Sequence, residues 1–132
     1  MYLNYSYENI KYNNHEFEVK QILFEAVKGV LDLTKYSNIN IIICESQNIK
    51  SIINYPPQLI KLYCNNNKIV SINNLPETLE ELYCYNNEII KLDNLPSKLK
   101  ILSCFTNKIE SLDNLPNSLE KLYCPYNYKL KY

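Results

Sequence analysis

The chain has 132 residues and carries 14 basic and 14 acidic side chains, so its formal net charge is zero at neutral pH. This length allows one domain with a modest hydrophobic core. The charge balance argues against general binding of nucleic acid or anionic membranes, because both normally depend on an excess of basic residues. Every basic residue is lysine, and asparagine and tyrosine occur 20 and 13 times. We interpret this bias as the mark of an AT-rich genome, so it indicates no mechanism.

Residues 1–34 contain two predicted elements. The segment Ile10-Lys11-Tyr12-Asn13-Asn14-His15-Glu16-Phe17 suits a hairpin with a two-residue turn at Asn13-Asn14, because asparagine tolerates positive φ. Further on, apolar residues recur at the i, i+3, i+4, i+7 spacing, which predicts an amphipathic helix over residues 17–33. The residues with this spacing are Val19, Ile22, Leu23, Ala26, Val27, Val30 and Leu31. We expect residues 1–34 to form an N-terminal cap; a partner-binding helix is the alternative.

Residues 1–34 are not expected to form a membrane-spanning helix or a secretory signal. The expected helix is too short, and too polar on one face, to span a bilayer. No apolar run follows the N-terminus, so a cleaved secretory signal is not expected. A cytoplasmic location follows as the expectation.

From residue 35 onwards, one cysteine recurs at every twentieth position, which is the signature of an internal repeat. The unit reads Leu59-x-x-Leu62-x-Cys64-x-x-Asn67-x-Ile69. A proline recurs eight residues before each cysteine from the second onwards, at Pro56, Pro76, Pro96 and Pro116. The predicted units are residues 35–54, which are degenerate, then 55–74, 75–94, 95–114 and the terminal 115–132.

The repeat predicts a stack of coils. Its leucine and cysteine positions alternate with period two, which indicates a short strand with one buried face. Twenty residues cannot also hold a full α-helix and its loops, so the return side must be extended or 3₁₀-helical. A single unit cannot bury its apolar face, whereas stacked units can do so by forming a parallel sheet with roughly 4.8 Å between strands.

The pattern L-x-x-L-x-C-x-x-N-x-I resembles the leucine-rich repeat consensus, with cysteine in place of its third leucine. The opening Leu75-Pro76-x-x-Leu79-x-x-Leu82 resembles the 20-residue class of bacterial effectors, and similar cysteine-bearing repeats occur in giant viruses of amoebae. The resemblance covers residues 55–132 and, less closely, 35–54. It implies an α/β solenoid with a short parallel sheet on the concave face, an extended or 3₁₀ convex side and an N-terminal helical cap. It also implies a viral protein in the host cytoplasm, but no particular partner.

The cysteines and asparagines of the repeat are interpreted as scaffold. Adjacent cysteine Cβ atoms should lie nearly 5 Å apart, whereas a disulfide requires about 3.8 Å. Zinc sites use closely spaced ligands, which a uniform 20-residue spacing does not provide. We therefore predict buried thiols, amides that bond the turns, no metal site and no cofactor. The predicted ladder residues are Cys44, Cys64, Cys84, Cys104, Cys124, Asn67, Asn87, Asn107 and Asn127.

The outward strand positions form the predicted binding surface. Exposed aromatic residues among adaptable polar neighbours are typical of protein-binding surfaces. The alternative is that a tyrosine-rich composition alone places tyrosine there. The candidate residues are Tyr63, Tyr83, Tyr85, Phe105, Tyr123, Tyr126, Lys61, Glu81 and Lys121.

The sequence predicts no enzyme. His15 is the only histidine and has no nucleophile placed beside it by spacing, and Gly29 is the only glycine, so a phosphate-cradling loop is absent. We predict a module that binds a protein through the concave face, and the viral resemblance implies that this partner is a host protein. The alternative is an assembly protein that self-associates through its C-terminal coil, where Lys129 and Lys131 alone protect the last strand. Single-stranded nucleic-acid binding is disfavoured by the zero net charge.

Overall fold

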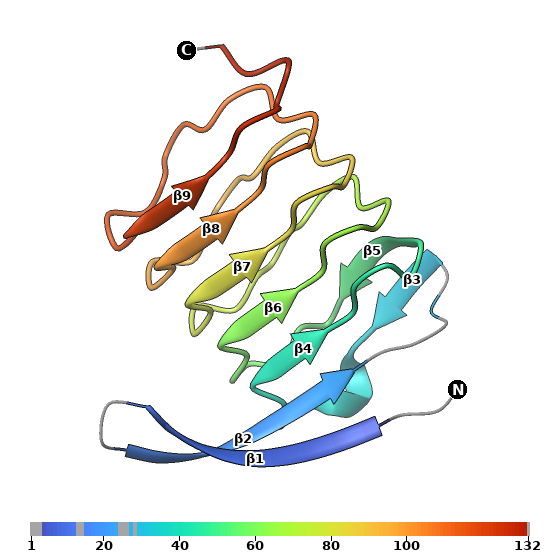
Figure 1. Ribbon diagram of the computed structural model, residues 1–132, viewed down its shortest axis with the longest axis vertical. Helices are drawn as coiled ribbons and strands as arrows, with labels where there is room; N and C mark the ends of the chain where they lie inside the picture. Colours follow the sequence, from blue (N-terminus) through green and yellow to red (C-terminus); the bar gives the residue numbers. More distant parts are fainter. Residues whose placement is uncertain (1–3, 13–14, 24–26, 28, 132) are drawn as a thin grey trace.

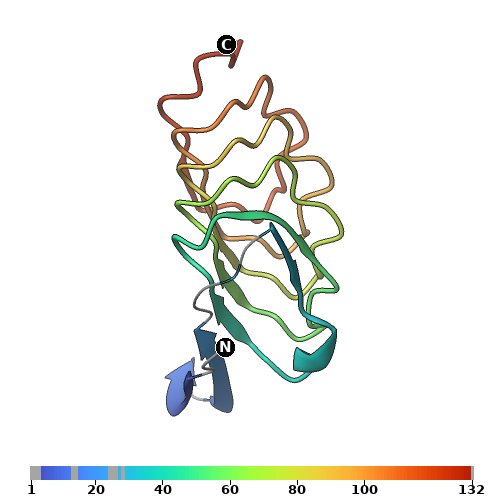
Figure 2. The ribbon, with the colours of Figure 1, turned by 90° about the vertical axis from the view of Figure 1, so that its right-hand side faces the viewer.

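The computed structural model describes the backbone of residues 4–12, 15–23, 27 and 29–131, and the side chains of residues 27 and 29–131. The described chain forms a β-solenoid of about five parallel turns, stacked along the long axis of the molecule (Figure 1). Each turn contributes one short strand to a common sheet and returns behind it, as a second strand in the first two turns and as irregular backbone in the later ones (Figure 2).

The regular structure of the described residues consists of β-strands and one short 3₁₀ helix, η1. The elements in chain order are β1 (Asn4–Tyr12), β2 (His15–Leu23), β3 (Gly29–Asp32), η1 (Thr34–Tyr36), β4 (Ile41–Ile43), β5 (Ile49–Ile53), β6 (Lys61–Tyr63), β7 (Glu81–Tyr83), β8 (Ile101–Ser103) and β9 (Lys121–Tyr123).

The main sheet has the order β1-β2-β4-β6-β7-β8-β9. All its neighbours from β2 onwards pair parallel, and each strand residue lies opposite the residue 20 positions further along, as Leu62 lies opposite Leu82. The strands β3 and β5 form a second, parallel pair behind the main sheet (Figure 1). The 20-residue repeat of the sequence therefore sets the register of the sheet, because equivalent residues of successive repeats lie side by side.

The helix predicted over residues 17–33 is wrong where the structure describes that range. Residues 15–23 form β2, which pairs with β1 in an antiparallel hairpin and with β4 on its other edge. Residues 29–32 form β3, in which Leu31 is buried and Val30 is 57% exposed. That burial alternates with period two, and Gly29 has φ +79°, which no right-handed helix permits. Residues 24–26 and 28 lie outside the described residues.

The N-terminal segment instead continues the repeat upstream. Gln21-Ile22-Leu23 lies opposite Ile41-Ile42-Ile43, again an offset of 20 residues. Val19 and Ile22 also fall 40 residues before Leu59 and Leu62, so the apolar pattern matches a degenerate coil. Pairing with β2 gives the edge of β4 hydrogen-bonding partners that a packed helix could not supply. The hairpin then lies at the end of the sheet (Figure 1).

The core lies between the main sheet and the returning backbone. The central strand leucines and the cysteine two residues later point inward and are fully buried in the inner coils. They are joined by the leucine that precedes each strand and the isoleucine that follows each asparagine. The fully buried members of the core are Leu33, Ile42, Cys44, Ile49, Leu59, Leu62, Cys64, Ile69, Leu79, Leu82, Cys84, Ile89, Leu99, Leu102, Cys104 and Ile109.

Two kinds of turn close each coil. The carbonyl of each repeat proline accepts a hydrogen bond from the leucine three residues later, as Pro76 does from Leu79 at 3.0 Å. Other turns require positive φ, which asparagine adopts more readily than most residues. In a chain with one glycine, this requirement accounts for part of the asparagine bias. The asparagines with positive φ are Asn48, Asn54, Asn66, Asn74, Asn86, Asn94 and Asn114.

Candidate binding face of the parallel sheet

The outer surface of the main sheet carries three rows of side chains, each made by equivalent positions of successive coils. We call this surface the sheet face. The first row is Ile41, Lys61, Glu81, Ile101 and Lys121; the second is Ile43, Tyr63, Tyr83, Ser103 and Tyr123; the third, just after the strands, is Glu45, Asn65, Tyr85, Phe105 and Pro125. Parallel pairing places neighbours within a row about 4.8 Å apart.

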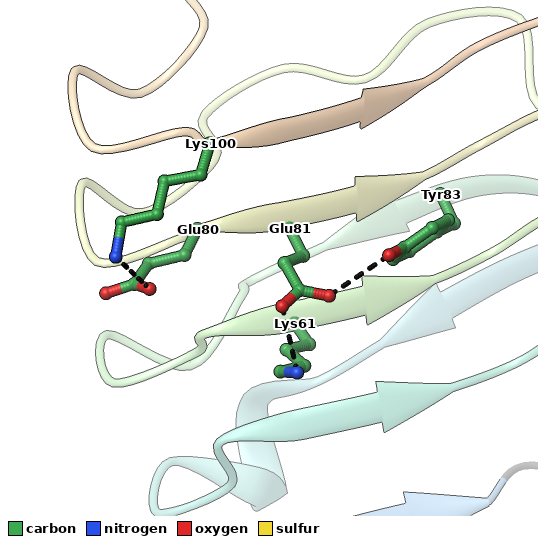
Figure 3. A network of polar contacts seen from close by, with 5 residues as sticks. All are labelled: Lys61, Glu80, Glu81, Tyr83 and Lys100. Atoms are coloured by element: carbon green, nitrogen blue, oxygen red, sulfur yellow. Dashed lines mark hydrogen bonds and ion pairs between the residues drawn. The ribbon is translucent and has the colours of Figure 1, made fainter. Parts of the chain in front are cut away.

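Two candidate residues of the first row neutralise each other. Lys61 Nζ lies 2.9 Å from Glu81 Oε1, and their side chains are only 15% and 14% exposed. Tyr83 donates its hydroxyl to Glu81 Oε2 at 3.1 Å (Figure 3). Partial burial raises the pKa of Tyr83 to about 12, and the negative charge of the Glu81 carboxylate is the second cause. The hydroxyl therefore keeps its proton at neutral pH. The ion pair therefore holds Tyr83 in place and adds no net charge to the face.

The aromatic candidates stack in two pairs. The rings of Tyr63 and Tyr83 are nearly parallel, with centroids 4.7 Å apart and an interplanar angle of 2°. Tyr85 and Phe105 form the second pair, at 4.3 Å and 7°. The centroid separations match the spacing of the strands that carry them. The stacking fixes four rings without any contribution from a ligand.

A shallow, open depression of about 570 Å³ lies over these rings. Six predicted candidates line it: Tyr63, Tyr83, Tyr85, Phe105, Tyr123 and Lys121. Lys61, Glu81 and Tyr126 do not line it, although Tyr126 is 65% exposed. The structure thus brings most of the candidate set together around one feature.

Four further residues line the depression that are not among the candidates from the sequence: Glu45, Asn65, Ile101 and Ser103. Ser103 is 4% exposed and is the one small residue in the second row. Asn65 is 1% exposed, and its Oδ1 atom accepts no hydrogen bond from a described residue. The signal for Ser103 was present in the sequence, as an interruption of an otherwise bulky row.

Beneath the face, each repeat asparagine bonds two coils together. Asn87 donates through Nδ2 to the carbonyls of Cys64 and Cys84, both at 3.0 Å, and its Oδ1 accepts from the backbone N–H of Ile69 at 3.0 Å. Asn67, Asn107 and Asn127 make the equivalent bonds in their own coils. These amides fix the turn after each strand, and so fix where the third row lies.

All five cysteines are free thiols, and the four inner ones are fully buried. Burial raises the pKa of Cys44 and of Cys104 from 9.0 to about 12, and raises the pKa values of Cys64 and Cys84 well above 9.0. A thiol must ionise to act as a nucleophile or metal ligand. The inner cysteines therefore serve as apolar core residues.

Alkaline pH is expected to destabilise the protein through these thiols. An unfolded chain releases a thiol proton near pH 9, whereas folded Cys44 and Cys104 hold theirs until about pH 12. The stabilisation is complete below pH 9 and falls with rising pH by about 1.4 kcal/mol per pH unit for each thiol. Urea denaturation of the wild type and of a Cys44→Ala, Cys104→Ala variant checks this. Between pH 9 and 12, the free energy of unfolding should fall less steeply in the variant than in the wild type. Equal slopes would exclude these two thiols as a cause of the loss.

Among the described residues, no group of three or more His, Cys, Asp or Glu side chains gathers closely enough to hold a metal ion. No helical segment in the described ranges combines the length and hydropathy needed to cross a bilayer.

The fold and the face together define a class: a β-solenoid repeat protein with an aromatic depression on its parallel sheet. Comparison with known proteins does not narrow this class, because no protein-family model matches the chain and no curated protein does.

Proposed function

We propose that this chain is a non-catalytic interaction module that binds a partner protein through the sheet face. The observation that carries the proposal is the depression lined by stacked aromatic rings. Tyrosine and phenylalanine supply contact area at low entropic cost, and such residues dominate the energetics of protein interfaces. The two stacked pairs are already ordered, which lowers the cost of binding further.

We assign the solenoid to the leucine-rich repeat type, and the chain to a viral protein acting in the cytoplasm of a host. The consensus positions and the turn asparagines support the repeat type. The resemblance to repeats of giant viruses, together with the asparagine-rich and lysine-only composition, supports the viral assignment.

The described chemistry favours binding over catalysis. The inner thiols are buried and hold their protons, so they do not supply a nucleophile. The face is close to neutral, since Lys61 and Glu81 compensate each other and Glu45 opposes Lys121 in sign. A neutral face suits a protein partner better than a phosphate backbone.

Removing the two central tyrosines tests the proposal. A Tyr83→Ala, Tyr85→Ala variant should lose capture of the partner from a host-cell lysate, because it removes one ring from each stacked pair. Tyr128→Ala is the matched control, since Tyr128 is 88% exposed and does not line the depression. Circular dichroism establishes that both variants are folded. Undiminished capture by the folded double variant would exclude this face as the binding site.

Self-association is a second candidate function, supported by the strand β9. Leu122 is 38% exposed there, whereas its equivalents Leu62, Leu82 and Leu102 are fully buried. A further strand pairing with β9 would cover it. Sedimentation should then show a mass that rises with concentration in the wild type and not in a Leu122→Lys variant. A single monomeric mass at all concentrations would rule this function out.

A further inference from the structure

The second row of the sheet face is a ladder of aromatic rings with one rung missing. Tyr63 and Tyr83 stack at 4.7 Å, and Tyr123 lies two strands beyond Tyr83. The strand between them carries Ser103, whose small side chain lies at the floor of the depression. The ladder therefore has a gap with an aromatic residue on each side.

The backbone spacing at the gap leaves room for one aromatic ring. Two strand spacings separate the backbones that carry Tyr83 and Tyr123 by roughly 9.5 Å. Half of that distance is close to the 4.7 Å centroid separation of Tyr63 and Tyr83, so one planar ring matches the spacing between the two positions. Ile101 and Phe105 flank Ser103 along the chain and also line the depression, so they close the gap at both ends.

One charged group lies at the rim beside this gap. Lys121 lines the depression on β9, is exposed, and makes no ion pair with a described residue. By contrast, Lys61, which occupies the same repeat position three coils earlier, is held by Glu81 at 2.9 Å. A partner that brings a carboxylate next to its ring would give Lys121 a counter-ion.

On this basis we infer that the face recognises a partner segment in which an aromatic side chain is followed by an acidic residue, with the ring inserted between Tyr83 and Tyr123 and the carboxylate beside Lys121. The inference rests on the proposed function and specifies what that face binds. A nucleobase could enter the same gap, but one unpaired lysine and the Glu45 carboxylate give its phosphates little compensation.

A tryptophan probe tests the inference directly, because the protein contains no tryptophan and selective excitation then reports the probe alone. The probe is a capped tetrapeptide, glycine-tryptophan-glutamate-glycine. We expect saturable binding with a blue shift of the indole emission. Replacing the tryptophan of the probe with leucine should abolish binding when followed by isothermal titration, and replacing its glutamate with lysine should weaken binding several-fold.

The decisive variant fills the gap from within. Ser103→Tyr should complete the ladder, keep the melting temperature at or above that of the wild type, and weaken probe binding by at least about tenfold. Ser111→Tyr is the matched control, because Ser111 is exposed outside the sheet face, and it should bind as the wild type does. Lys121→Gln should weaken the glutamate-containing probe and leave unchanged a probe with glutamine in that place.

Other outcomes overturn the inference in distinguishable ways. No saturable probe binding, or equal binding by the folded Ser103→Tyr variant, would exclude the gap as the recognition element. If that variant still captured a partner that Tyr83→Ala, Tyr85→Ala loses, the proposed function would stand and only the gap would fail. Tighter binding of a single-stranded oligothymidylate than of the peptide would replace the protein partner with a nucleic acid.

Discussion

Replacing Asn87 with leucine is expected to lower the free energy of unfolding by about 3–5 kcal/mol. The backbone N–H of Ile69 would lose its Oδ1 acceptor in a buried position. The carbonyls of Cys64 and Cys84 would each lose one bond but keep another, from Asn67 and Asn107 respectively. One orphaned donor and the bonds lost from two shared acceptors together account for the size of the effect.

Urea denaturation, monitored by circular dichroism, measures this change in the free energy of unfolding. The matched control is Asn73→Ala, because Asn73 is exposed and its amide makes one long bond, 3.5 Å, to the Ser71 hydroxyl. The control should change stability by less than about 0.5 kcal/mol. Similar losses in the two variants would mean that the buried amide ladder contributes no more than a surface amide.

Truncating Leu82 to alanine is expected to cost about 2–5 kcal/mol. Leu82 is fully buried and lies between Leu62 and Leu102 in register, so the stacked backbones on both sides limit how far the site can collapse. In a solenoid each coil contacts only its neighbours, so a cavity in a middle coil weakens two interfaces.

The equivalent truncation on β9 provides the comparison. Leu122 occupies the same repeat position but is 38% exposed, so Leu122→Ala should cost about 1 kcal/mol. Thermal unfolding of the two variants beside the wild type checks both values. A larger loss for Leu122→Ala than for Leu82→Ala would contradict the burial pattern described above.

The register of the stack could be predicted from the sequence because each coil repeats one buried cysteine and one turn asparagine at a constant spacing. The period of 20 residues also excluded a helical return side, and the described residues from 37 to 131 contain no helix. The N-terminal helix could not be excluded in the same way. Val19, Ile22 and Leu31 fit a helical spacing and a degenerate coil equally well, and only pairing with β4 and β5 decides between them.

The alternation of strand residues predicts which side chains lie on the sheet face, but it does not predict which of them contact one another. The repeat alignment assigns Lys61, Glu81 and Tyr83 to adjacent positions without showing that they contact one another. Side-chain rotamers decide that Lys61 and Glu81 pair and which residues line the depression. Ser103 is distinguished only by the aromatic residues at the neighbouring positions of its row, so amino-acid composition alone does not identify it as a candidate.

The shared amide ladder has a consequence for how such a chain changes length. Each of the repeat asparagines Asn67, Asn87, Asn107 and Asn127 bonds the carbonyls of its own cysteine and of the cysteine one coil before, and the chemical groups are the same at each level. If residues 75–94 were deleted, Asn107 would meet Cys64 where it now meets Cys84, and Tyr63 would take the place of Tyr83 beside Ser103. We therefore expect deletion or duplication of one whole 20-residue coil to preserve the amide ladder across the junction, whereas a change of another length within the segment from the strand to the asparagine would put that coil out of register.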